Sequence, residues 1–139
     1  MENKNQMEHL IECALEVRKQ AYAPYSKFQV GCSVLCEDGR IFTGCNIENV
    51  SYPAGLCAER VAIFKAVSEG AKKLKSIVVA GGKEGQVRDF CYPCGMCRQV
   101  MREFCDPKTL TVVVAKSTRE YKVYTLDQLL PESFGPETF

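Results

Sequence analysis

The chain has 139 residues, of which 46% are hydrophobic, and a net charge of +1 from 18 basic and 17 acidic residues. This length suits one compact domain spanning 1–139, and the composition is that of a soluble globular protein. Near-neutral charge without a basic tail gives no support to a nucleic acid polymer or a membrane surface as partner. A small neutral ligand fits this charge balance better.

No segment reaches the roughly 20 apolar residues that a membrane helix needs, and the N-terminal segment lacks the apolar stretch of a signal peptide. The sequence therefore predicts a cytoplasmic protein. Its nine cysteines would then lie in a reducing compartment, where disulfides are unlikely. Metal binding or burial explains them better.

The predicted elements alternate between helices and strands. An amphipathic helix with apolar residues from Met7 to Leu15 ends before Pro24, and Asp38-Gly39 marks a hairpin turn. Strands are expected at 28–36, 41–47, 76–82, 109–116 and 120–126; helices follow at 57–70 and from Cys94 to 105, with a short helical turn at 125–131. This order predicts a mixed sheet covered by helices, an α/β or α+β layered domain.

The stretch CYPCGMC places Cys91, Cys94 and Cys97 three residues apart. Two such thiols can bind one metal when the first lies in a turn and the second in the first turn of a helix. Zinc needs four tetrahedral ligands. Cys57, at the start of the predicted helix 57–70, is the best third candidate.

Glu59 lies two residues after Cys57, too close to bind the same ion comfortably but close enough to reach an open fourth position. Zinc would acidify a water there, and Glu59 could take its proton. Cys-x-Glu followed by Pro-Cys-x-x-Cys is the known signature of zinc deaminases. Spacing alone would predict only a zinc site with an open position.

Alternatives remain for these thiols. Cys91 could close the site as a fourth ligand, or the motif could be a redox pair, an iron–sulfur site or a set of buried thiols. We expect His9 to lie at the solvated surface. We expect the other cysteines to pack in the core; they are Cys13, Cys32, Cys36, Cys45 and Cys105.

Three thiolates leave a zinc site with a charge of −1, which weakens the metal as a Lewis acid. Both ligand groups lie at predicted helix N-termini, where the dipole is positive. Arg60 could also donate hydrogen bonds to a thiolate. Arg98 could do the same, or remain a solvated charge; we favour Arg60.

Five segments in order resemble the small, homotetrameric cytidine deaminases across nearly the whole chain. They are AYAPYSKFQVG (21–31), GCNIEN (44–49), CAER (57–60), PCGMCRQV (93–100) and LLPESF (129–134). The resemblance implies a three-layer α/β/α fold with a mixed five-stranded sheet. It also implies zinc-dependent hydrolysis of cytidine and 2′-deoxycytidine to the uridines with release of ammonia, and a homotetramer with shared active sites.

The same resemblance implies roles for single residues. Cys57, Cys94 and Cys97 would hold one Zn²⁺, and Glu59 would move protons. The substrate would be bound by Asn46 and Glu48 at the ribose, by Phe28 and the backbone near Ala58 at the base, and by Tyr52 and Phe134 completing the pocket. Without the resemblance, sugar binding and loop capping are equally expected roles for Asn46 and Glu48. A core position is then favoured for Phe28.

Two segments depart from the family pattern. Cys91 and Tyr92 precede the proline where a small polar residue is more familiar, and SYPAGLCAER differs in its middle. Both flank the zinc ligands and leave substrate preference open. The rivals are a deaminase of another cytosine nucleoside such as blasticidin S, a polynucleotide deaminase and a non-catalytic zinc module.

Overall fold

The computed structural model describes residues 3–139. One sheet is formed by β1 (Phe28–Cys36), β2 (Ile41–Cys45), β3 (Leu74–Lys83), β4 (Thr111–Ala115) and β5 (Tyr121–Thr125). The α-helices are α1 (Lys4–Val17), α2 (Ala58–Ser68), α3 (Gly95–Glu103) and the short α4 (Leu126–Leu129). Every predicted strand and helix is present. The second strand ends earlier than predicted, because beyond Cys45 the chain makes only isolated bridges at Ile47.

The sheet has the strand order β2-β1-β3-β4-β5. Strands β3 and β4 run parallel, and every other neighbouring pair is antiparallel. Gly39 in the β1–β2 turn has φ +92°, which glycine adopts without strain. The predicted mixed five-stranded sheet is confirmed.

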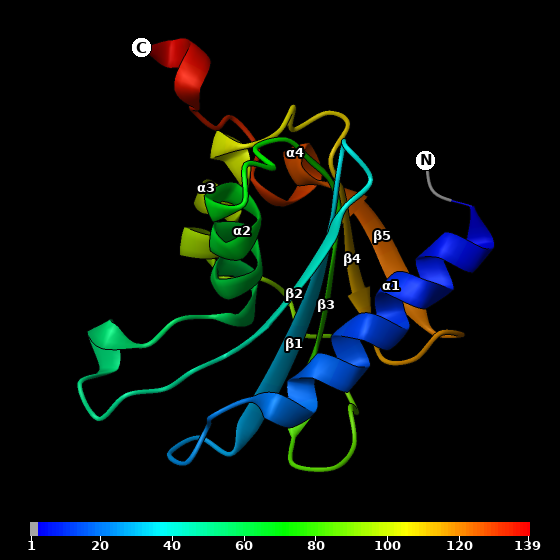
Figure 1. The fold of residues 1–139 in the computed structure, drawn as a ribbon, viewed down its shortest axis with the longest axis vertical. Helices are drawn as coiled ribbons and strands as arrows, with labels where there is room; N and C mark the ends of the chain where they lie inside the picture. The colour runs from blue at the N-terminus through cyan, green and yellow to red at the C-terminus, as the bar shows by residue number, and fades with distance from the viewer. Residues whose placement is uncertain (1–2) are drawn as a thin grey trace.

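Helices cover both faces of this sheet (Figure 1). Alternate strand residues point to opposite faces. On one face, Val34, Ile77 and Val79 pack with buried residues of α2 and α3. On the other face, Leu35 and Val78 pack with the apolar stripe of α1. The predicted three-layer α/β/α arrangement is therefore confirmed. None of the helices in the described range combines the length and apolar character needed to span a membrane.

The cysteines outside the metal motif follow the predicted burial only in part. Cys32 and Cys36 are buried on β1, whereas Cys13 and Cys45 are half-buried. Cys105 lies in the turn after α3, because the helix ends at Glu103, and is also half-buried. His9 is exposed on α1, as predicted.

Gly44 brings strand β2 into direct contact with the first turns of α2. A Cβ atom at this position would lie 2.5 Å from the backbone nitrogen of Ala62 and 2.7 Å from the carbonyl oxygen of Ala58. These distances are far below van der Waals contact, and both neighbouring atoms belong to rigid backbone. Glycine here therefore sets how closely the start of α2, which carries Cys57, approaches the sheet.

Replacing Gly44 by alanine should lower the free energy of unfolding by about 3 kcal/mol, because the helix must move away from the strand. We expect a fall of roughly 10 °C in the melting temperature. Gly95→Ala is the matched control, since nothing lies within 4 Å of the Cβ it would add. Equal melting temperatures for the two variants would contradict the close-packing argument.

Candidate active site

Two helix N-termini bring the three metal-motif thiols together. Cys57 is the N-cap residue of α2 and Cys94 is the N-cap residue of α3, both with extended backbone. Neither side chain caps its helix by a hydrogen bond, so both thiols are free to face a common point. Cys97 lies in the first turn of α3 and is fully buried. The turn-then-helix geometry predicted for Cys94 and Cys97 is present.

The spacing of these thiols fits a tetrahedral metal. The Sγ atoms of Cys57 and Cys94 are 4.0 Å apart, and those of Cys94 and Cys97 are 3.5 Å apart. Zn–S bonds of about 2.3 Å in a tetrahedron would separate two sulfur atoms by about 3.8 Å. Within the described residues 3–139, these three form the one group with metal-binding spacing. Cys91 does not belong to it, which favours an open site over the alternative of a closed four-cysteine site.

An arginine supports the thiol group electrostatically. Arg60 donates from Nη2 to the Cys57 sulfur over 3.4 Å. Arg98 instead donates to the carbonyl oxygens of Pro93 and Leu129, each at 2.8 Å. Hydrogen bonds from Cys97 and then Arg60 lower the pKa of Cys57 to about 5. The thiolate that a zinc ligand requires is therefore favoured at Cys57, whereas the hydrogen bond to Cys57 raises the pKa of Cys97.

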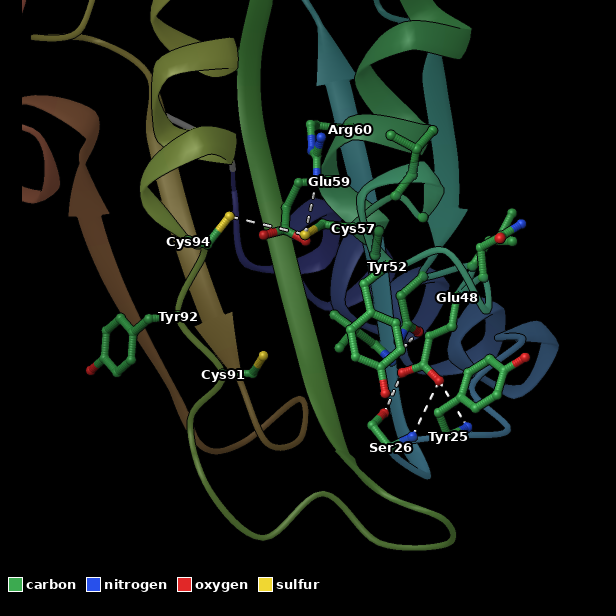
Figure 2. A pocket seen from close by; sticks show the side chains of 17 residues that line it. Tyr25, Ser26, Glu48, Tyr52, Cys57, Glu59, Arg60, Cys91, Tyr92 and Cys94 are labelled. Atoms are coloured by element: carbon green, nitrogen blue, oxygen red, sulfur yellow. Dashed lines mark hydrogen bonds between the residues drawn. The ribbon is translucent and has the colours of Figure 1, made fainter.

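Glu59 is buried beside the thiols, with only 4% of its surface exposed. Figure 2 shows its carboxylate next to the sulfur atoms of Cys57 and Cys94. Burial is the main cause that raises the pKa of Glu59 to about 7, and the nearby Cys57 adds to it. A carboxyl group placed in this way can both accept and donate a proton near neutral pH.

A cavity of about 530 Å³ opens in front of Glu59. Of the residues expected at the site, Asn46, Glu48, Tyr52 and Ala58 line it together with Cys57, Glu59, Arg60 and Cys94. The structure thus brings polar side chains from 46–48 to the same cavity as the thiols, although they are remote in sequence. A cavity of this size is in the range of small-molecule sites.

The two polar residues Asn46 and Glu48 are held by backbone groups. Asn46 accepts from the Val30 nitrogen at 2.9 Å and donates to the Phe28 carbonyl oxygen at 2.8 Å. Glu48 accepts from the backbone nitrogens of Tyr25 and Ser26 at 3.0 and 3.2 Å. Both side chains therefore shape the adjacent chain, as the capping alternative predicted, and also line the cavity.

Tyr25 and Ser26 line the cavity too, and the sequence reasoning did not single them out. Their backbone and the Ser26 hydroxyl contact Glu48, while the Tyr25 ring lies 6.2 Å from that of Tyr52 (Figure 2). The signal that could have found them was their place in AYAPYSKFQVG, two and three residues before Phe28.

Two expected substrate residues do not line this cavity. Phe28 is 36% exposed and meets the site through its backbone, which bonds to Asn46. Phe134 is 56% exposed in the C-terminal segment, where its carbonyl oxygen accepts from Gln99. In Figure 1 the C terminus and the 46–56 loop lie at opposite ends of the molecule. Phe134 thus does not line the cavity of its own chain.

The two unusual residues before Pro93 point in different directions (Figure 2). Cys91 lines the cavity and packs against β3, where a Cβ added at Gly81 would meet its sulfur at 2.8 Å. Tyr92 pairs with Tyr124, with their hydroxyl oxygens 2.9 Å apart. Burial raises the pKa of Cys91 to about 11, so this thiol is protonated and differs chemically from Cys57.

Three metal-spaced thiols, two of which line a cavity, an arginine on one sulfur and a buried carboxyl group beside them define a zinc-dependent hydrolytic site. The family model described as "Cytidine and deoxycytidylate deaminase zinc-binding region" matches residues 4–114. The chain belongs to this family. Its cofactor is one Zn²⁺, which the Cys57/Cys94/Cys97 group suits.

Relatives match nearly the whole chain. The cytidine deaminase of Sporosarcina psychrophila is 45% identical over 131 residues, 94% of this chain and 93% of that protein. The probable cytidine deaminase of Dictyostelium discoideum is 42% identical over 97% of this chain and 88% of its own length. The crystal structure of cytidine deaminase from Burkholderia pseudomallei has a TM-score of 0.80 at 43% identity, covering 91% of this chain and 97% of that one.

Proposed function

We propose that this chain hydrolyses cytidine and 2′-deoxycytidine to uridine and 2′-deoxyuridine with release of ammonia. The observation that carries the proposal is the buried Glu59 carboxyl group, placed beside three metal-spaced thiols and facing a cavity lined by Asn46 and Glu48. The relatives named cytidine deaminase support the same reaction.

The site residues divide the work of this reaction. Cys57, Cys94 and Cys97 would hold the zinc ion, which as a Lewis acid would make water a nucleophile near neutral pH. Glu59 takes one proton from the attacking water and delivers it to ring N3, so that C4 becomes more electrophilic. It then carries the second proton to the amino group, the C4–N bond breaks, and ammonia leaves.

The remaining residues bind the nucleoside. Asn46 and Glu48 offer an amide and a carboxylate on one side of the cavity, which suits the hydroxyl groups of a ribose. The backbone at Ala58 contacts the edge of the base, and the Phe28 ring, which does not line the cavity in this structure, would have to turn into it to pack against the pyrimidine. Arg60 keeps Cys57 in its thiolate form by its hydrogen bond.

The active form is a homotetramer in which neighbouring copies complete each cavity. Several large apolar side chains are highly exposed in one copy: Val50 at 78%, Tyr52 at 77%, Phe134 at 56% and Phe139 at 98%. Tyr52 lines the cavity, whereas Phe134 does not line the cavity of its own chain. A second copy that supplies Phe134 would bury both residues and shield the substrate from water.

Light scattering at micromolar concentration should therefore give four times the mass of one chain. Phe134→Ala should leave this mass unchanged and raise KM for cytidine about tenfold, since an aromatic contact is lost. Phe139→Ala is the control at a more exposed position. A monomer with full activity would contradict shared active sites.

We place the protein in the cytoplasm. All nine cysteines are free thiols in the structure, and three of them must stay reduced to hold zinc. A reducing compartment meets this requirement.

The substrate is tested by incubating zinc-loaded protein with cytidine, 2′-deoxycytidine, cytidine 5′-monophosphate, blasticidin S and a cytosine-containing oligonucleotide. We expect equal amounts of uridine or 2′-deoxyuridine and ammonia from the two nucleosides, at least about a hundredfold faster than any reaction of the others. Turnover of blasticidin S alone, or of the oligonucleotide alone, would overturn the proposed substrate class.

A further inference from the structure

The hydroxyl group of Ser26 lies at the centre of the hydrogen bonds that hold the sugar-binding side of the cavity. It donates to Oε2 of Glu48 and accepts from the Phe28 backbone nitrogen at 3.0 Å. A serine hydroxyl has one proton and two lone pairs. Because an ionised carboxylate can only accept, the proton must point to Glu48 and leave a lone pair for Phe28.

The same hydrogen bonds join three of the residues that we assign to the nucleoside, Asn46, Glu48 and Phe28. Ser26 bonds to the backbone nitrogen of Phe28, and Asn46 bonds to the carbonyl oxygen of Phe28. Glu48 is bonded to Ser26 through both of its oxygen atoms. Asn46, Phe28, Ser26 and Glu48 therefore form one chain of hydrogen bonds along the cavity.

The backbone around Ser26 is built to hold this position. Lys27 has φ +61°, a left-handed conformation that is uncommon for a lysine. It is fixed on both sides, since its nitrogen donates to the Ala23 carbonyl oxygen at 3.0 Å and its carbonyl oxygen accepts from Glu84 at 3.2 Å. Lys83 also donates from Nζ to the Ser26 carbonyl oxygen at 3.2 Å. The hydroxyl is thus presented to Glu48 by a segment with defined geometry.

We propose that Ser26 is a positioning residue for ribose recognition, acting through Glu48 and Phe28 rather than by contact with the reacting atoms. This inference rests on the proposed function. With one Glu48 oxygen fixed by Ser26 and the other by two backbone N–H groups, the unused lone pairs of the carboxylate keep one direction. Without the hydroxyl, one oxygen loses its donor, the Phe28 N–H loses its acceptor, and the carboxylate can rotate.

The test combines removal of the Ser26 hydroxyl with removal of the sugar hydroxyls. Ser26→Ala should raise KM for cytidine about tenfold and change kcat less than about twofold. For 2′,3′-dideoxycytidine, which has no ring hydroxyl groups to bind, the same substitution should change kcat/KM less than about twofold. The preference of the wild-type protein for cytidine over the dideoxy substrate should therefore shrink about tenfold.

Three further variants separate positioning from general stability. Ser26→Thr keeps a hydroxyl at this exposed position and should restore KM to near the wild-type value. Ser26→Cys keeps the size of the side chain but has a weaker hydrogen-bond donor, so its KM should match that of Ser26→Ala. It replaces the alanine variant in the test if that variant folds poorly. Ser68→Ala removes a hydroxyl that bonds only to its own helix, at the Lys65 carbonyl oxygen, and should change nothing.

Equal losses for cytidine and the dideoxy substrate, or a fall in kcat alone, would overturn the positioning role and leave the deaminase function standing. Unchanged kinetics in Ser26→Ala and Ser26→Cys would also overturn it. If the wild-type protein converts neither substrate, the proposed function fails first, and this inference fails with it.

Discussion

Replacing Glu59 by glutamine should reduce cytidine deamination at least about a thousandfold while the bound zinc stays unchanged. The carboxyl group is buried beside the thiols but is not a member of the metal-spaced group. Glutamine has nearly the same size and still fills the site, but it cannot take a proton from water or pass one to the substrate.

The measurement is kcat for cytidine together with zinc content by elemental analysis. Glu103→Gln is the matched control, because Glu103 is exposed at the end of α3, and it should keep full activity. Turnover within about tenfold of wild type in Glu59→Gln would remove Glu59 from the proton transfers. Loss of zinc together with activity would instead make Glu59 part of the metal site.

Replacing Cys97 by serine should release zinc and abolish activity. Cys97 is fully buried, and its sulfur lies 3.5 Å from that of Cys94. Serine preserves the packing but offers a hydroxyl that keeps its proton near neutral pH. We expect zinc affinity to fall more than about a hundredfold, beyond the usual effect of losing a residue that only supports a ligand. Competition with a chromogenic chelator measures this change.

Cys91→Ser is the informative control for zinc binding. Cys91 lies in the same motif and the same cavity but outside the metal-spaced group. Its replacement should leave zinc at one ion per chain, with affinity within about threefold of wild type. A loss of zinc affinity as large as that of Cys97→Ser would identify Cys91 as a fourth ligand and contradict an open site.

The fold followed from local patterns that the tertiary structure did not override. The strand predicted at 28–36 is β1 with the same bounds, because its residues alternate between the two layers of core. Cys57 and Cys94 were expected at helix starts and are the N-cap residues of α2 and α3. The Asp38-Gly39 hairpin and the parallel β3–β4 pair also follow from turn residues and from the helix between those strands.

The details of the site depend on contacts between segments that are distant in sequence. Both Arg60 and Arg98 follow a metal ligand in the sequence, and packing decides which of them donates to a ligand sulfur. Arg98 donates to the Leu129 carbonyl oxygen, whereas Arg60 donates to Cys57. The hydrogen bond between Ser26 and Glu48 likewise forms only because the fold brings two separate loops together. That Phe134 does not line the cavity of its own chain was not visible in the sequence, because it depends on the path of the C-terminal segment.

Zinc-dependent deamination is tested most directly by a zinc titration of metal-free protein, followed by the fall in cytidine absorbance and by ammonia release. We expect no deamination without metal, and a rate that rises in proportion to added zinc until one ion is bound per chain. Deamination by the metal-free protein, or no deamination of cytidine with one zinc ion bound per chain, would contradict it.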